Sequence, residues 1–150
     1  KDKGSIYYIN VSQDTFKLGG SSFAQVMNVI GNEVPTVKSA AYTKTVFNTL
    51  QKLIKNEKIA AGHDVASGGL ITTLLEMCFA DTQLGANLNL SELSEEELLK
   101  VLLAENCAVV IQASEDASVE SELAENNIDF VKIGAVTSDE TETSFRADHV

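Results

Sequence analysis

The sequence predicts an α/β fold in which helices pack against one sheet. Three observations support this prediction. Short β-branched or aromatic segments alternate with segments of helical periodicity. Their order, β-α-α-β-α-β-α-β-α-β with a weak further strand, is typical of a layered sandwich. The chain has 150 residues, of which 44% are hydrophobic, so it is long enough and apolar enough to form one domain with a single core.

The predicted strands are apolar runs bounded by turn residues. Residues 6–11 are β-branched and aromatic, and residues 108–111 form the clearest buried strand. Weaker strands are expected at 86–90 and around Phe145. The remaining predicted strands cover residues 59–64 and 130–133. Residues 59–90 and 107–133 would each form a β-α-β unit, and the polar segment 137–144 would be an exposed, mobile turn.

The predicted helices follow capping residues or glycines. A short helix over residues 23–30 is expected after Ser21 or Ser22 and before Gly31. The other predicted helices cover residues 38–56, 68–80, 95–105 with a Ser94–Glu97 capping box, and 115–126 after Ser114. The helix over 68–80 is apolar nearly all round, so we expect it to be buried on more than one side. Glu76 within it requires a partner or a route to solvent.

Charge is distributed unevenly along the chain, whose net charge is −11. Residues 1–58 hold eight lysines and four acidic residues, whereas residues 59–150 hold three basic and eighteen acidic residues. The acidic residues lie mostly on the predicted helices 95–105 and 115–126, as is typical of solvated helix faces. Because binding to nucleic acid needs clustered Lys and Arg, we expect no nucleic-acid partner.

The sequence also supports expectations about where the protein is located in the cell and whether the chain is part of a longer protein. No stretch approaches the roughly 18 apolar residues of a membrane span, and the N-terminus is not that of a signal peptide. Cys78 and Cys107 lie in apolar runs, which predicts reduced core residues of a cytoplasmic protein without a membrane partner. The chain begins with Lys1 rather than Met, so we expect a piece of a longer protein.

The segment 63–70, His-Asp-Val-Ala-Ser-Gly-Gly-Leu, predicts a strand end, a tight turn and a helix start. Backbone N–H groups at a helix start suit an anion, and glycines let the backbone approach a ligand closely. An aspartate on the last residue of a strand can hold the metal that accompanies a phosphate. Asp64 is therefore a candidate metal ligand, and Ser67, Gly68 and Gly69 are candidate nucleotide-binding residues.

Each of these residues also has a structural interpretation. The segment could be a tight turn with a buried His63 and a helix-capping Asp64, and Ser67 could be the N-cap of the following helix. His63 could be a general base or a ligand, although a histidine at a strand end is more often a hydrogen-bonded structural group.

A second glycine pair precedes the short helix. The amides of Gly19, Gly20 and Ser21 are candidate phosphate ligands, whereas an ordinary capped helix after a loop is the interpretation that the pattern favours. The sequence has no Ser-His-Asp signature, nucleophile elbow or Walker loop, so no catalytic residue is assigned.

Taken together, the two motifs resemble a known family. Residues 18–26 are similar to the opening helix of the C-terminal lobe of aminoimidazole ribonucleotide synthetase-like proteins. Residues 63–70, continued by Leu74, Glu76, Met77 and 79–80, resemble the strand, turn and helix of phosphoribosylformylglycinamidine synthase. The resemblance covers roughly residues 5–136.

The resemblance implies a fold and an activity. The fold is a three-layer α/β/α sandwich around a mixed sheet, partly like a ferredoxin fold. The activity is that of an ATP-dependent C–N ligase, a glutamine amidotransferase that makes formylglycinamidine ribonucleotide from formylglycinamide ribonucleotide in purine biosynthesis. The implied cofactors are Mg²⁺ and ATP or ADP. The implied partners are an N-terminal lobe and a glutaminase domain of the same protein, so an isolated lobe would be inactive.

The family's site residues carry over in part. Asp64 matches the family's magnesium-binding aspartate, Gly68 and Gly69 match its paired glycines, and His63 matches its histidine, whose role stays open. The chain departs from the family at two positions. Ala66 replaces a serine that contacts nucleotide, and Ser67 stands where the family often has aspartate.

Three alternatives to a catalytic lobe stay open. The chain could be a structural lobe that holds a locked ADP. It could belong to another superfamily member, such as a selenophosphate synthetase or thiamine-phosphate kinase relative. It could also be a stand-alone regulatory module of ferredoxin-like type.

Overall fold

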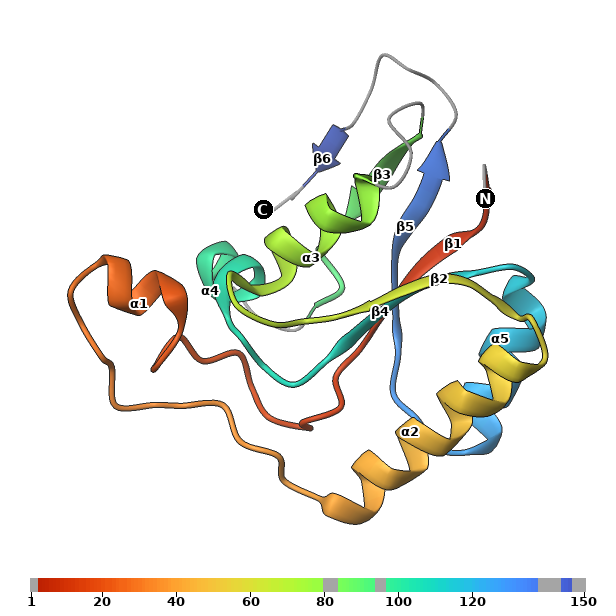
Figure 1. The fold of residues 1–150 in the computed structure, drawn as a ribbon, viewed down its shortest axis with the longest axis horizontal. Coiled ribbons are helices and arrows are strands. Elements are labelled where there is room, and N and C mark those ends of the chain that lie inside the picture. The colour runs from red at the N-terminus through yellow and green to blue at the C-terminus, as the bar shows by residue number, and fades with distance from the viewer. Residues whose placement is uncertain (1–2, 80–83, 94–96, 138–143, 147–150) are drawn as a thin grey trace.

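The computed structural model describes residues 3–79, 84–93, 97–137 and 144–146. Within these residues a sheet forms the middle of the molecule and helices cover it (Figure 1). The strands are β1 (Ser5–Ile9), β2 (Ile59–Asp64), β3 (Gly85–Asn89), β4 (Val109–Ala113), β5 (Val131–Thr137) and β6 (Ser144–Arg146). The helices are α1 (Ser22–Val26), α2 (Ala40–Lys55), α3 (Gly69–Cys78), α4 (Leu98–Leu103) and α5 (Asp116–Glu125).

The sheet is mixed, as predicted, with the strand order β2-β4-β1-β5-β3-β6. Every neighbouring pair is antiparallel except β3 and β6, which are parallel. Strands β4 and β5 both run antiparallel to β1, which lies between them. The predicted β-α-β unit over 107–133 is therefore present, but its two strands enclose β1 instead of pairing with each other.

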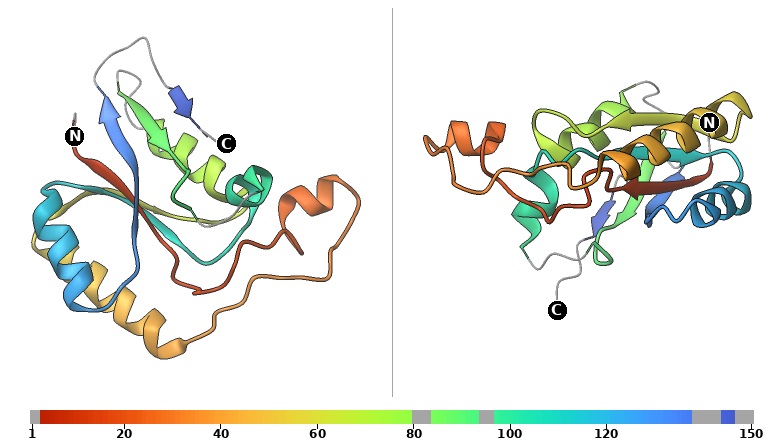
Figure 2. Two further views of the ribbon diagram at one scale, coloured as in Figure 1. Left: turned by 180° about the vertical axis from the view of Figure 1, so that it is seen from behind. Right: turned by 90° about the horizontal axis from the view of Figure 1, so that it is seen from below.

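Two apolar layers lie on opposite faces of the sheet and confirm the three-layer α/β/α architecture. Residues alternate along β1, so that Ile6 and Tyr8 pack beneath α3 and α4, whereas Tyr7 and Ile9 pack beneath α2 and α5. The two helix pairs occupy opposite sides of the sheet in Figures 1 and 2. Each fully buried aliphatic or aromatic side chain contributes about 1.5–3 kcal/mol of transfer free energy.

The boundaries of α1, α4 and α5 differ from the predictions. Helix α1 ends at Val26 because Asn28 adopts a φ of 57° and the Val29 N–H donates back to Ala24 O at 2.9 Å, which closes the helix before Gly31. Helix α4 ends at Leu103, earlier than expected. The N-cap of α4 is Glu97, without a side-chain capping bond, and Ser94 of the predicted capping box lies outside the described residues. The N-cap of α5 is Glu115 and not Ser114.

Burial also departs from the predictions at two places. Helix α3 buries Leu70 and Leu74, but Phe79 just beyond it is 72% exposed, so the helix is not enclosed on more than one side. Cys107 is exposed and Cys78 is half-buried, so the prediction of a core position is wrong for Cys107. The predicted strand around Phe145 is present as β6, and residues 138–143 of the predicted mobile turn lie outside the described residues.

The chain leaves the body of the molecule between β1 and α2. Residues 19–37 carry α1 away from the sheet (Figure 1). The buried carboxylate of Asp14 ties the two ends of this excursion together, because it accepts from Lys17 Nζ at 2.9 Å and from the Thr36 N–H at 3.0 Å. No helix in the described part of the chain is long and apolar enough to cross a membrane.

Candidate functional site

Asp64 lies at an exposed corner of the sheet. Strand β2 is an edge strand, and Asp64 is its last residue, opposite Val109 of β4. The Thr73 hydroxyl of α3 donates to Asp64 O at 3.1 Å and fixes the backbone there. The Asp64 side chain is 78% exposed, and His63 Nδ1 lies 3.6 Å from its Oδ1, so the outer side of the carboxylate can meet a cation or a neighbouring part of the protein. Asp64 does not cap α3, whose N-cap is Gly68.

His63 links the end of β2 to α3. Its Nδ1 lies 2.7 Å from Asp64 O, and its Nε2 lies 3.3 Å from Oε2 of Glu76. The ring is half-buried, and both nitrogens face protein oxygens. His63 is therefore a positioning group at this turn, and it provides the partner that Glu76 requires.

The glycine pair has a structural role of its own. Gly68 adopts a φ of 91° and Gly69 a φ of 74°, the left-handed region that favours glycine. A Cβ on Gly69 would lie 2.6 Å from Leu102 O and 2.7 Å from Leu103 Cα. The absent side chain therefore lets the start of α3 approach the end of α4, rather than making room for a ligand.

The amides of this turn already have acceptors. The Gly69 N–H donates to Ala66 O at 3.0 Å, and the Gly68 N–H donates to Oε1 of Glu105 at 2.8 Å. Ser67 is exposed, and within the described residues its hydroxyl makes no hydrogen bond, so it is not the N-cap of α3. A ligand at the turn can therefore meet Ser67 freely, but it would meet the Gly68 amide only by displacing Glu105.

Glu105 joins the two glycine motifs. The same Oε1 atom also accepts the Ser22 N–H at 2.8 Å, so one carboxylate lies at the first turns of both α1 and α3. Burial alone would raise the pKa of Glu105, but the N–H groups of Gly68 and Ser22 outweigh burial and hold the pKa below its usual range. Sequence reasoning missed this residue and treated it as part of a solvated acidic helix.

The candidate phosphate ligands at the first glycine pair are engaged within the chain. The amides of Gly19, Gly20 and Ser21 donate to the backbone oxygens of Glu33, Ile30 and Leu18 at 2.9, 2.8 and 3.1 Å. The Ser21 hydroxyl accepts the Ala24 N–H and caps α1. This position is a capped helix after a loop, the interpretation that the pattern favours, and a phosphate would reach these amides only by displacing the hydrogen bonds that they make within the chain.

The Asp64 corner can supply one oxygen ligand to a metal. The described residues contain no group of three or more His, Cys, Asp or Glu side chains placed to hold a metal ion. Mg²⁺ commonly takes only one or two carboxylates, together with phosphate and water oxygens. An exposed carboxylate therefore fits part of a magnesium site whose other ligands come from outside these residues. Cys107 is exposed as a residue, but partial desolvation of its thiol, together with the nearby charge of Asp64, raises the pKa of Cys107.

The match to a known protein family covers the same motifs. Residues 11–146 match the family described as AIR synthase related protein, C-terminal domain. The chain belongs to this family. The match includes both glycine motifs and the Asp64 corner, and it confirms the resemblance seen in the sequence.

Relatives of this AIR synthase related domain have consistent names. The chain is 34% identical to the probable phosphoribosylformylglycinamidine synthase, chloroplastic/mitochondrial, of Arabidopsis thaliana, over 98% of this chain and 11% of that protein. It is 36% identical to phosphoribosylformylglycinamidine synthase of Dictyostelium discoideum, over 75% of this chain and 8% of that protein. The chain thus spans about a tenth of the length of these curated relatives.

Solved structures of PurL from T. maritima have the same fold. The complex with FGAR matches with a TM-score of 0.67 and 15% identity, covering 91% of this chain and 24% of that chain. The complex with ATP matches with a TM-score of 0.64 and 12% identity, covering 91% of this chain and 22% of that chain. At these identities the likeness establishes the fold alone.

Proposed function

We propose that the protein containing this AIR synthase related domain converts formylglycinamide ribonucleotide to formylglycinamidine ribonucleotide in purine biosynthesis. The supporting observation is the match of 98% of the chain to a relative named as a phosphoribosylformylglycinamidine synthase. The T. maritima neighbours, solved with FGAR and with ATP, are consistent with this substrate and this nucleotide. In this proposal the domain is one lobe of an ATP-dependent C–N ligase.

The small share of the relatives that the chain spans supports the proposal that further domains belong to the same protein. We propose that an N-terminal lobe of the same protein completes the nucleotide site and that a glutaminase domain supplies ammonia. The 150 residues alone are then inactive. We also propose a cytoplasmic location. The Arabidopsis relative is described as chloroplastic/mitochondrial, so imaging of the tagged full-length protein is needed to test this location.

Within the lobe, we propose that Asp64 holds Mg²⁺ and that Ser67 contacts the nucleotide. Both residues are exposed at one turn, and neither carboxylate nor hydroxyl is sequestered in the core. Bound Mg²⁺ would neutralise phosphate charge and position the nucleotide. Gly68 and Gly69 shape the turn, while their N–H groups already donate to Glu105 and Ala66, so a bound nucleotide would meet the Gly68 amide only by displacing Glu105.

The full-length protein tests this assignment. Asp64→Asn keeps the size of the side chain and removes its charge, so the purified variant should contain less bound nucleotide and magnesium, measured by mass spectrometry and metal analysis. Glu125→Gln is the matched control, because Glu125 lies on α5 and, within the described residues, its carboxylate accepts a hydrogen bond from Ser121 alone. Unchanged nucleotide and metal in Asp64→Asn would show that Asp64 has no such role.

A second candidate function is a structural lobe that holds a locked ADP. The observation that favours it is Ala66, which is exposed at the turn and has no polar group for a nucleotide. Nucleotide that stays bound to the full-length protein through repeated turnover would support a locked site. Exchange of labelled ATP at the rate of turnover would support a catalytic site.

A further inference from the structure

The excursion over residues 19–37 carries an apolar tip, which we define as residues 26–30, Val-Met-Asn-Val-Ile. Four large apolar side chains of these consecutive residues are 84, 59, 56 and 79% exposed, in the order Val26, Met27, Val29 and Ile30. Single exposed apolar residues are common on protein surfaces. A contiguous group of them is typical of a surface that another molecule covers.

The described part of the chain does not cover the apolar tip. Helix α1 stands apart from the sheet in the views of Figures 1 and 2. The helix buries Ala24 alone among its five residues. Farther along the excursion, Val34 and Val37 are also exposed. The excursion therefore has almost no apolar core of its own, and its large apolar side chains face solvent.

Backbone contacts close the excursion into a defined loop. The Gly19 N–H donates to Glu33 O at 2.9 Å, and the Gly20 N–H donates to Ile30 O at 2.8 Å. A Cβ on Gly31 would lie 2.9 Å from Gly19 Cα, so the two backbone segments can approach this closely because Gly31 has no side chain. Since the loop is already formed, it loses little conformational entropy when a partner covers it.

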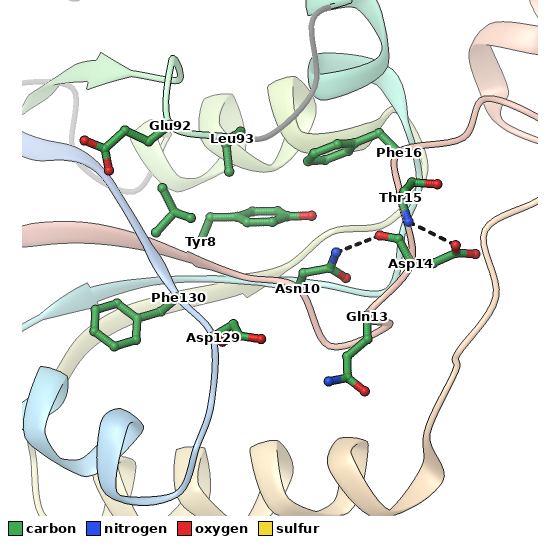
Figure 3. Close-up of a pocket in the computed structure, with 11 residues that line it drawn as sticks. Tyr8, Asn10, Gln13, Asp14, Thr15, Phe16, Glu92, Leu93, Asp129 and Phe130 are labelled. Carbon is green, nitrogen blue, oxygen red and sulfur yellow. Dashed lines mark hydrogen bonds between the residues drawn. The ribbon is translucent and has the colours of Figure 1, made fainter.

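The chain just before the excursion is held by hydrogen bonds. The Asn10 side-chain amide donates to Asp14 O at 2.8 Å, and the Thr15 N–H donates to Oδ1 of Asp14 at 2.9 Å (Figure 3). Buried Asn106 donates from Nδ2 to Thr15 O at 2.9 Å. The fold therefore sets the position of the excursion relative to the sheet.

The excursion also adjoins the Asp64 corner. One oxygen of Glu105 accepts both the N–H of Ser22, the first residue of α1, and the N–H of Gly68 in the turn after Asp64. The proposed Mg-nucleotide site at Asp64 needs ligands from another lobe. The start of α1 thus lies beside the place where that lobe would dock.

The chemistry of the excursion defines the partner. Glu33 is the one charged residue in 19–37, whereas 22% of the whole chain is charged. A surface that covers the apolar tip is therefore itself apolar. A membrane surface fits less well, because the excursion has no Lys or Arg to meet anionic headgroups. The curated relatives are about ten times longer than this chain, so a protein of their length has further lobes that can supply such a surface.

We propose that the apolar tip docks into an apolar groove on another lobe of the same polypeptide, the lobe that completes the Mg-nucleotide site. This inference rests on the proposed function, because it takes the second lobe from there. The tip holds that lobe against the domain, while Asp64 faces the nucleotide that lies between them. Two glycine motifs then have one purpose: the first closes the docking loop, and the second shapes the turn at the site.

Oxidation of Met27 in the full-length protein tests whether the tip is covered. Hydrogen peroxide oxidises exposed methionine, and mass spectrometry measures the rate at each position. A docked tip should make Met27 at least about tenfold slower to oxidise in the native protein than in the same protein unfolded in urea. Because Met27 is 59% exposed in this domain, a rate within about twofold of the unfolded protein would show an uncovered tip and overturn the proposal.

Photo-cross-linking then identifies what covers the tip. Benzoylphenylalanine is placed at Val26, and isotopically light and heavy full-length proteins are mixed before irradiation. We expect cross-links within one molecule to a segment outside residues 1–150. Light-to-heavy cross-links would show that a second copy covers the tip. That result, cross-links to residues 1–150 alone, or no cross-link would overturn the proposal.

A matched pair of variants locates the apolar contact. Ile30→Ser removes one side chain of the tip and should raise Met27 oxidation in the native full-length protein at least about threefold. Ile54→Ser makes the same change on α2, where Ile54 is also exposed, and should leave Met27 oxidation unchanged. Both side chains face solvent in this domain, so neither change should unfold it. Equal increases in the two variants would show a general loosening and overturn the proposed contact.

These measurements separate docking from the proposed function. Protection of Met27 and the cross-link need neither substrate nor turnover. A full-length protein that lacks synthase activity but protects Met27 would refute the proposed function alone. An active synthase in which Met27 is oxidised at the unfolded rate would refute the docking alone.

Discussion

The Gly68 N–H donates to Oε1 of Glu105 at 2.8 Å, and this bond joins the turn before α3 to the segment after α4. The Ser22 N–H reaches the same oxygen, so the carboxylate also holds the first residue of α1. A protein acid thus occupies the place where the sequence pattern predicts an external anion. The two glycine motifs form one hydrogen-bonded unit around Glu105.

The first prediction concerns the stability that Glu105 provides. Glu105→Ala leaves two N–H groups without their charged acceptor and should lower the free energy of unfolding by about 3 kcal/mol. Glu105→Gln retains a neutral acceptor and should lose about half as much. Urea unfolding at pH 7 measures both values. Glu125→Ala is the control, and a loss as large as that of Glu105→Ala would contradict this role.

The second prediction concerns pH. The folded state holds the pKa of Glu105 below its usual range, so this group stabilises the fold above its unfolded pKa of about 4.3. The stabilisation disappears as the pH falls through the lower pKa that Glu105 has in the folded state. The difference in unfolding free energy between the wild type and Glu105→Gln should therefore be constant from pH 7 to pH 5 and shrink below pH 4. A difference that grows on acidification would contradict the assignment.

The third prediction compares the two glycines of the turn. A Cβ at Gly69 meets the backbone of Leu102 and Leu103, which cannot move aside, whereas a Cβ at Gly68 meets the side chain of Thr72. Gly69→Ala should therefore destabilise the domain by more than about 3 kcal/mol, and Gly68→Ala by less. Thermal unfolding measures the difference. Thr72→Ala should recover part of the loss in Gly68→Ala but none of the loss in Gly69→Ala.

Local patterns predicted the elements and the position of Asp64. The run of β-branched and aromatic residues marks β1, and the strand, turn and helix pattern of 63–70 places Asp64 at the end of β2, where the structure has it. The layers follow from these elements because each has an apolar face to bury. The boundaries of α1 and α4 were less predictable, since they depend on left-handed residues and on contacts outside the helix.

Long-range contacts could not be predicted in this way. Glu105 lies 37 residues from Gly68 and 83 from Ser22, and nothing near it in sequence distinguishes it from a solvated acid. The role of Gly69 could not be predicted either. A glycine that allows a ligand to approach and a glycine that allows a neighbouring helix to approach have the same local sequence pattern. The strand order also depends on pairings between strands that are far apart in the sequence.

The fourth prediction concerns Asp14 and the excursion that carries α1. The ammonium of Lys17, followed by the Thr36 N–H and Lys38, holds the pKa of this buried carboxyl far below its usual value. Asp14→Asn should lower the free energy of unfolding by about 3 kcal/mol, because it removes the negative charge that faces two lysines and replaces one acceptor oxygen with an NH₂ donor. It should also increase amide exchange across residues 19–37, measured by mass spectrometry. Unchanged exchange there would show that Asp14 does not secure the excursion.

The fifth prediction is that residues 1–150 alone bind Mg-ADP weakly or not at all. Asp64 is the one carboxylate of this chain in the proposed Mg-nucleotide site, and Mg²⁺ needs further oxygen ligands. The Gly68 amide, in addition, already donates to Glu105. Calorimetry with Mg-ADP should therefore show no micromolar binding to these residues, whereas the full-length protein should bind. Tight binding to the isolated chain would mean that the lobe forms a complete nucleotide site, and it would refute the proposal that a second lobe supplies the missing ligands.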